Sequence, residues 1–119
     1  FHWGAKFTAV SFAVTTCLWA ATLIIGPSSS KYGNAMEAAR AGDFKATKEA
    51  ELRYIRDQKM DQVIELWTVY IEARPDDPRG YHERGGAYSQ LRDRRAIADA
   101  KRACRMGYKP SCDALAKIH

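Results

Sequence analysis

The apolar and polar positions divide the chain into one long uncharged run and a series of amphipathic stretches. Residues 7–25 contain no charged side chain, and a helix of this length, rising about 1.5 Å per residue, spans the roughly 30 Å of a bilayer's hydrocarbon core. Trp3 and Lys6 suit one membrane interface, and Gly26 and Pro27 end the helix. We therefore predict a transmembrane helix, with a cleaved signal peptide and a buried core helix as alternatives. Its apolar members include Phe7, Phe12, Leu18, Trp19, Leu23, Ile24 and Ile25.

The rest of the chain shows helical periodicity interrupted by glycine and proline. The apolar spacing predicts helices over residues 34–57, 60–74, 80–91 and 94–106. The first is interrupted at Gly42 and Asp43, a dipeptide that allows a split into two helices, and Pro75 and Pro78 separate the second from the third. The second has the strongest amphipathic pattern, with one face formed by Val63, Ile64, Trp67, Tyr70 and Ile71.

The third predicted helix contains two adjacent glycines, Gly85 and Gly86, in its interior. Each glycine costs about 1 kcal/mol relative to alanine in a helix, so the pair is expected where a second helix packs too closely for a side chain. The fourth predicted helix offers such a surface through its small residues Ala96, Ala100 and Ala103.

This pattern resembles the tetratricopeptide repeat. The family's first helix carries an aromatic residue, a leucine-glycine pair and a tyrosine, and Tyr81, Arg84 with Gly85, and Tyr88 stand in that order here, with Arg84 in place of leucine. Positions 63 and 96 are 33 residues apart and positions 54 and 88 are 34 apart, close to the family's period of about 34. The resemblance implies a degenerate repeat, a second repeat and a capping helix over residues 44–78, 79–110 and 111–119.

The predicted fold is all-α. A single N-terminal transmembrane anchor in residues 1–30 precedes a soluble tetratricopeptide-like domain in residues 31–119, with about two repeats and a capping helix. Two repeats are fewer than the usual three, so the cap, a disulfide or a partner must cover the remaining apolar faces.

Cys104 and Cys112 lie on either side of a predicted helix end at Gly107. Their spacing is similar to that of the Sel1-like branch of the repeat family, in which such pairs are bridged, and two antiparallel helices around a tight turn meet the distance requirement. Two reduced, buried cysteines are the alternative. A bridge implies an oxidising compartment. We therefore expect a single-pass protein of a bacterial inner membrane with a periplasmic soluble domain. The charges flanking the span do not decide its orientation. Because Phe1 rather than Met comes first, a start segment is expected to be processed or missing.

No pattern of catalytic or cofactor-binding residues is present in the sequence. The histidines, at positions 2, 82 and 119, have no metal-ligand spacing, and neither a CxxC nor an HExxH motif nor a glycine-rich phosphate loop occurs. We therefore expect no enzyme activity, no cofactor and no metal.

The expected function is docking on other proteins. The exposed candidates on the third helix and its following turn are Tyr81, His82, Arg84, Gln90 and Arg92, with Tyr88 expected to be the buried tyrosine. Residues 79–119 carry ten Lys or Arg and four Asp or Glu, which makes the fourth helix basic. This basic face, an expected rim of the docking surface, consists of Arg94, Arg95, Arg102 and Arg105, with Arg92, Lys101 and Lys109 in the same cluster.

Tetratricopeptide-like folds are mostly scaffolds, so the resemblance suggests an accessory or assembly subunit of a larger membrane complex, of an energy-conversion or secretion type. Its basic face is either a solvated surface or a binding surface for an acidic protein or anionic lipid headgroups. A membrane-surface tether that binds anionic lipid is therefore the alternative function. Nucleic acid is not expected, because the chain has no nucleic-acid-binding motif.

Overall fold

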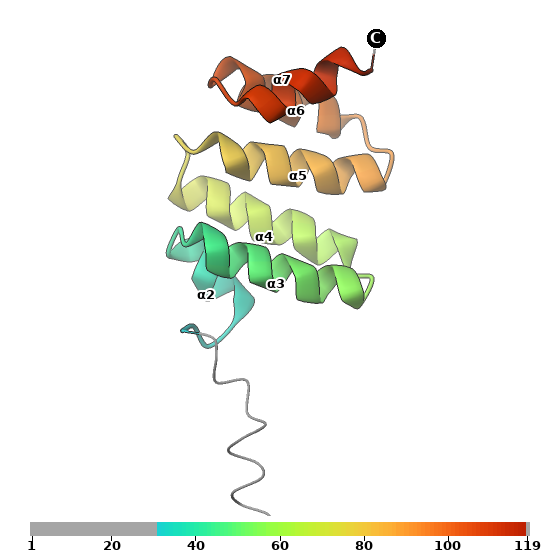
Figure 1. Cartoon of the computed structure of the whole chain (residues 1–119). Coiled ribbons are helices and arrows are strands. Elements are labelled where there is room, and N and C mark those ends of the chain that lie inside the picture. Colours follow the sequence, from blue (N-terminus) through green and yellow to red (C-terminus); the bar gives the residue numbers. More distant parts are fainter. Residues whose placement is uncertain (1–30, 119) are drawn as a thin grey trace, which may run out of the picture. The chain divides into compact units, whose positions relative to one another are not determined.

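The computed structural model describes residues 31–118, and every regular element in this part of the chain is an α-helix (Figure 1). The all-α prediction is thus confirmed for these residues, whereas the predicted transmembrane helix and anchor region lie outside them. The helices are α2 (Ala35–Arg40), α3 (Phe44–Arg56), α4 (Met60–Ala73), α5 (Pro78–Gln90), α6 (Arg95–Arg105) and α7 (Lys109–Ala116). Within residues 31–118, none of the helices has both the length and the apolar character needed to cross a bilayer.

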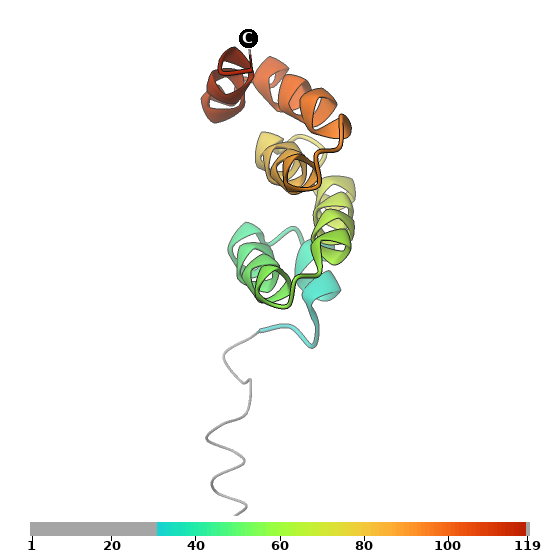
Figure 2. The same cartoon turned by 90° about the vertical axis from the view of Figure 1, so that its right-hand side faces the viewer.

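The six helices alternate between two layers (Figure 2). α3, α5 and α7 form one layer, named the A layer, and α2, α4 and α6 form the other, named the B layer. From α3 onward, each helix packs against its successor in the chain. Phe44 and Pro78, the first residues of α3 and α5, are 34 positions apart. The described domain is therefore repeat-like, with one pair formed by α3 and α4 and a second by α5 and α6, flanked by α2 and α7.

Local capping chemistry sets the boundary between α2 and α3. Gly42 adopts a left-handed backbone conformation with φ of +69°, which ends α2 and splits the helix predicted over residues 34–57. The Asp43 side chain then accepts a hydrogen bond from the backbone N–H of Ala46 at 3.1 Å. This bond satisfies one of the donors that every helix start leaves without an intrahelical partner.

Gly107 ends α6 in the same left-handed region, with φ of +91°. Its N–H donates to the carbonyl of Cys104 at 2.9 Å, and the N–H of Tyr108 donates to the carbonyl of Ala103 at 3.0 Å. These two bonds form a Schellman motif, which confirms the predicted helix end. α7 begins at Lys109, two residues before the predicted start of the capping helix.

The hydrophobic core is centred on α4. Val63, Leu66, Trp67 and Tyr70 are each at most 1% exposed, which confirms the strong amphipathic pattern of this helix. The Trp67 ring lies 5.3 Å from the Tyr70 ring and 5.6 Å from the Phe44 ring of α3. α4 thus supplies the large buried side chains against which α2, α3 and α5 pack.

A disulfide joins α6 to α7. Cys104 and Cys112 are bridged with their Cα atoms 4.8 Å apart, and this predicted pairing is confirmed. A second contact holds α7 against α5, where His82 Nδ1 lies 2.7 Å from the buried hydroxyl of Ser111. The last helix is therefore fixed both to its chain neighbour and to its neighbour in the A layer.

We expect the substitutions Cys104→Ser and Cys112→Ser, made together, to lower the free energy of unfolding by about 2–3 kcal/mol, because the bridge restricts the unfolded chain. Urea unfolding of the full chain in mild detergent, followed by circular dichroism, measures this loss. Cys17→Ser is the control and should leave the unfolding of the helical domain unchanged. Thiol labelling of denatured, unreduced protein should modify Cys17 only, and labelling of all three cysteines would contradict the bridge.

Candidate functional site

Two adjoining hollows lie between neighbouring helices of the A layer. One lies between α5 and α7 with α6 behind it, and the other lies between α3 and α5 with α4 behind it; each has a volume of about 220 Å³. Glu83 and Gly86 of α5 line both hollows, so we treat them as one A-layer groove. Its other lining residues include His82, Ser89, Ala96, Ile97, Ala114 and Ile118 in the first hollow, and Lys48, Glu51, Ile55, Met60, Val63 and Gln90 in the second.

The two adjacent glycines of α5 have different surroundings. A methyl group on Gly85 would lie 3.3 Å from the Cβ atom of Asp99 and 3.4 Å from the carbonyl oxygen of Ala96, so close packing against α6 favours a residue without a side chain. A methyl group on Gly86 would have no neighbour within 4 Å. The expectation of close helix packing is therefore correct for Gly85 and wrong for Gly86, which instead keeps the middle of the groove open.

A chain of polar contacts runs along the second hollow. Lys48 Nζ donates to Glu51 at 2.8 Å and to Glu83 at 2.7 Å, and the indole N–H of Trp67 donates to Glu51 at 2.7 Å. Partial burial lowers the pKa of Lys48, but the hydrogen bonds and charges of the two carboxylates outweigh it and raise this pKa above its usual value. The groove thus carries a fixed ammonium group between two carboxylates.

Two of the predicted docking residues, His82 and Gln90, line the A-layer groove. Gln90 is exposed, as expected, but His82 is only half-exposed because its ring bonds to Ser111 and packs against Tyr108 at 5.1 Å between ring centres. His82 is therefore less exposed than expected, and its contacts with Ser111 and Tyr108 help to hold α7 against α5.

Arg84 lies on the side of α5 that faces the B layer. Its Nε and Nη2 atoms each lie 2.8 Å from the carboxylate of Asp99, and Nη1 lies 3.2 Å from the hydroxyl of Thr68. The Arg84 side chain is 20% exposed and that of Asp99 is 8% exposed. The expectation that Arg84 is exposed is wrong, because it joins α4, α5 and α6 internally.

The two tyrosines of α5 behave differently. Tyr88 is 7% exposed, which confirms that it is the buried one. Tyr81 is half-buried between two guanidinium groups, with the Cζ atoms of Arg84 and Arg102 at 5.9 Å and 5.5 Å from its ring centre. Tyr81 therefore packs at the junction of α5 and α6, with part of its surface still open to solvent.

The predicted basic residues surround α6 but do not form one uniform surface. Arg95 pairs with Asp93 at 2.6 Å and lies over the Tyr88 ring, and Lys109 pairs with Asp113 at 3.0 Å. The remaining members are exposed: Arg92, Arg94, Lys101, Arg102 and Arg105. Arg92 adopts a positive φ of 56° in the turn after α5. Only part of the cluster is thus neutralised by neighbouring acids.

Several lining residues of the groove were not predicted from the sequence. Lys48 and Glu83 are 35 positions apart, and this spacing, close to the repeat period, is the one signal that places them on adjacent A-layer helices. No group of three or more metal-ligating side chains occurs within residues 31–118.

Comparison with known protein families, with curated proteins and with solved structures finds no match. The function proposed below therefore depends on the geometry of the groove and on the sequence patterns of the chain.

We expect Arg84→Ala to lower the free energy of unfolding by about 3 kcal/mol, because the buried carboxylate of Asp99 loses its cationic partner. The double variant Arg84→Leu with Asp99→Ala removes both charges and should recover most of this loss. Arg105→Ala, an exposed arginine of the same helical domain, should change stability by no more than about 0.5 kcal/mol. Urea unfolding compares the three, and an equal loss in the single and double variants would show that the ion pair is not the cause.

We expect opposite effects from alanine at the two adjacent glycines. Gly86→Ala should raise the free energy of unfolding by up to about 1 kcal/mol, because alanine favours the helix and meets no neighbour there. Gly85→Ala should lower it, because the added methyl group forces α5 away from α6. Thermal unfolding of the two variants tests this difference, and destabilisation by Gly86→Ala would mean that the groove is closed at this point.

Proposed function

We propose that this chain is a non-catalytic, membrane-anchored protein of tetratricopeptide-like type, whose helical domain docks on another protein through the A-layer groove. The supporting observation is Gly86, which leaves the groove open across two consecutive inter-helix hollows. A helix position without a nearby neighbour would favour alanine over glycine by about 1 kcal/mol. Glycine at this position instead leaves space for a partner at the surface of the groove.

The arrangement of the two hollows, each of about 220 Å³, suits a protein segment. The two hollows follow one another across α5, so an extended or helical segment could occupy both. The lining of the groove combines apolar side chains such as Ile97 and Ile118 with the ion pair of Lys48 and Glu83. This combination suits a partner with apolar anchors and polar flanks.

The proposed location rests on two further features. The uncharged run over residues 7–25 is long enough for a transmembrane helix, and the disulfide between Cys104 and Cys112 suits an oxidising compartment. Together they favour a single-pass protein of a bacterial inner membrane with its helical domain in the periplasm. A protein of this kind suits an accessory or assembly subunit of a larger membrane complex, of an energy-conversion or secretion type.

We expect Gly86→Leu to release the protein from its complex, because the larger side chain fills the middle of the groove. The measurement is purification of the full chain in mild detergent, with quantitative identification of the proteins that co-purify. Gly86→Ala is the matched control, since it keeps the groove almost as open, and it should retain the partners.

Circular dichroism must show the same helical signal for the two variants. Retention of the same partners by Gly86→Leu would contradict docking through the groove and would place the contact elsewhere on the chain.

A further inference from the structure

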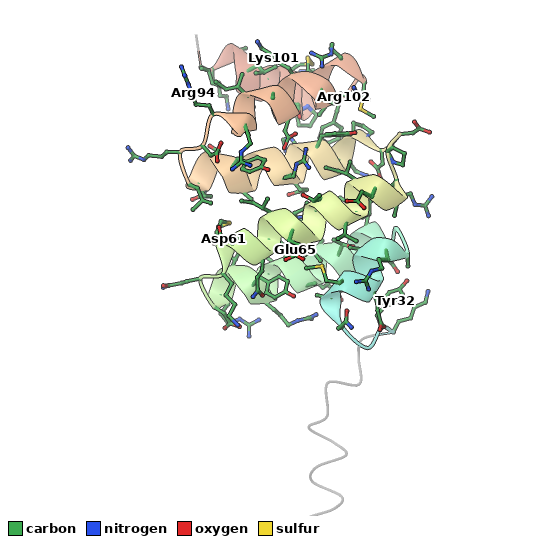
Figure 3. All side chains as sticks on the ribbon, turned by 180° about the vertical axis from the view of Figure 1, so that it is seen from behind. Tyr32, Asp61, Glu65, Arg94, Lys101 and Arg102 are labelled. Carbon is green, nitrogen blue, oxygen red and sulfur yellow. A yellow bond between two sulfur atoms is a disulfide. The ribbon has the colours of Figure 1, made fainter. Side chains whose placement is uncertain are left out.

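Two exposed stripes of opposite charge lie on the B-layer face, on the opposite side of the domain from the A-layer groove. In α4, Asp61, Glu65 and Glu72 recur at helical steps of four and seven residues and are all exposed. Arg94, at the N-cap of α6, begins a basic stripe that continues with Lys101 and Arg105. Figure 3 shows Asp61 and Glu65 on α4 and Arg94 and Lys101 on the α6 segment of the same face.

The two stripes occupy corresponding positions in the two helix pairs. Shifting Asp61 and Glu72 by 33 residues gives Arg94 and Arg105, the same spacing that relates Val63 to Ala96. The equivalent surface of the two B-layer helices is therefore acidic in the first pair and basic in the second.

None of these six side chains makes an ion pair within the part of the chain that the structure describes. Other charged side chains of the domain do find local partners, such as Arg95 with Asp93 and Lys109 with Asp113. The acidic and basic stripes are thus exposed, complementary and without a partner in the domain.

Between the two stripes, Arg84 joins α4, α5 and α6 internally, with its charge balanced by Asp99 and its Nη1 atom bonded to Thr68. Tyr81 lies beside it and is only half-buried. This central strip therefore consists of an internal ion pair and a half-buried tyrosine, with the exposed Arg102 5.5 Å from the tyrosine ring centre.

We propose that a second copy of this chain docks on the B-layer face, with the acidic stripe of each copy against the basic stripe of the other. α5 runs opposite to both α4 and α6, so α4 and α6 run in the same direction. A two-fold axis parallel to these helices and midway between them places α4 of one copy against α6 of the other. Equivalent positions then face each other, so Asp61 meets Arg94 and Glu72 meets Arg105 of the second copy. A two-fold axis in the plane of the face but perpendicular to the helices would instead oppose like charges.

The association depends on salt and on local concentration. Exposed ion pairs are individually weak, so the dimer is favoured by low ionic strength and by the confinement of two anchored copies to one membrane surface. Because the B-layer face and the A-layer groove lie on opposite sides of the domain, this dimer leaves the proposed docking function of the groove intact.

Charge reversal in two variants of the full chain tests the proposal. The acidic-stripe variant carries Asp61→Lys, Glu65→Lys and Glu72→Lys, and the basic-stripe variant carries Arg94→Glu, Lys101→Glu and Arg105→Glu. Sedimentation in mild detergent should show a dimer for the wild type at low salt and a monomer at about 1 M salt, where the Debye length is about 3 Å. Each variant alone should be monomeric, and an equimolar mixture of the two should form a heterodimer, since both of its contacts are again attractive.

A chain that carries all six substitutions provides a second readout. It should form a dimer with itself and should not pair with the wild-type chain. A monomeric wild type at low salt, reversal variants that remain dimeric, or a mixture that does not associate would overturn the proposal. Binding of wild-type protein to phosphatidylglycerol vesicles that only the basic-stripe variant loses, with no association in the mixture, would likewise overturn it and assign the basic stripe to anionic lipid.

Discussion

Burial of Trp67 creates a requirement that extends through three helices. A buried indole N–H without an acceptor is costly, and the carboxylate of Glu51 satisfies it at 2.7 Å. A carboxylate in that position needs a cation, which Lys48 supplies, and Lys48 in turn reaches Glu83 on α5. α3, α4 and α5 are therefore joined by one polar chain beside their aromatic packing. That chain ends in the A-layer groove, so the core of the first helix pair also determines the charge of the surface proposed for docking.

The second helix pair, α5 and α6, is held together by different residues. Where the first pair has Glu51 and Trp67, the positions one period later hold Gly85 and Ala100, and the backbones of α5 and α6 approach closely at Gly85. Small residues bury less apolar surface, so this pair depends more on specific polar links such as Arg84 with Asp99. The ion pair of Arg84 with Asp99 thus accompanies a difference in how the second pair is stabilised.

The sequence predicted features that depend on local spacing. The helices of residues 31–118, the burial of Tyr88, the cap at Gly107 and the pairing of Cys104 with Cys112 follow from helical periodicity, from glycine's access to positive φ and from family resemblance.

Features that depend on long-range contacts were missed or mistaken. Arginine is ordinarily an exposed residue, and only the position of Asp99 on α6 shows that Arg84 is internal. Gly85 and Gly86 are identical in sequence terms, and only the direction of each Cα–H toward α6 or toward the groove distinguishes them. Lys48 and Glu83 had no local signal, because their contact joins two helices separated by a whole repeat.

The disulfide also has a consequence for the order of events during maturation. Cys104 and Cys112 are eight residues apart, so the ring that they close is small and its ends meet often even in an unfolded chain. No other cysteine occurs in residues 31–118. Oxidation of this pair therefore does not require the rest of the domain to be folded, and it has no competing partner there. The covalent link can therefore form before or after the larger core around α4 assembles, and in either order it tethers α7 to α6.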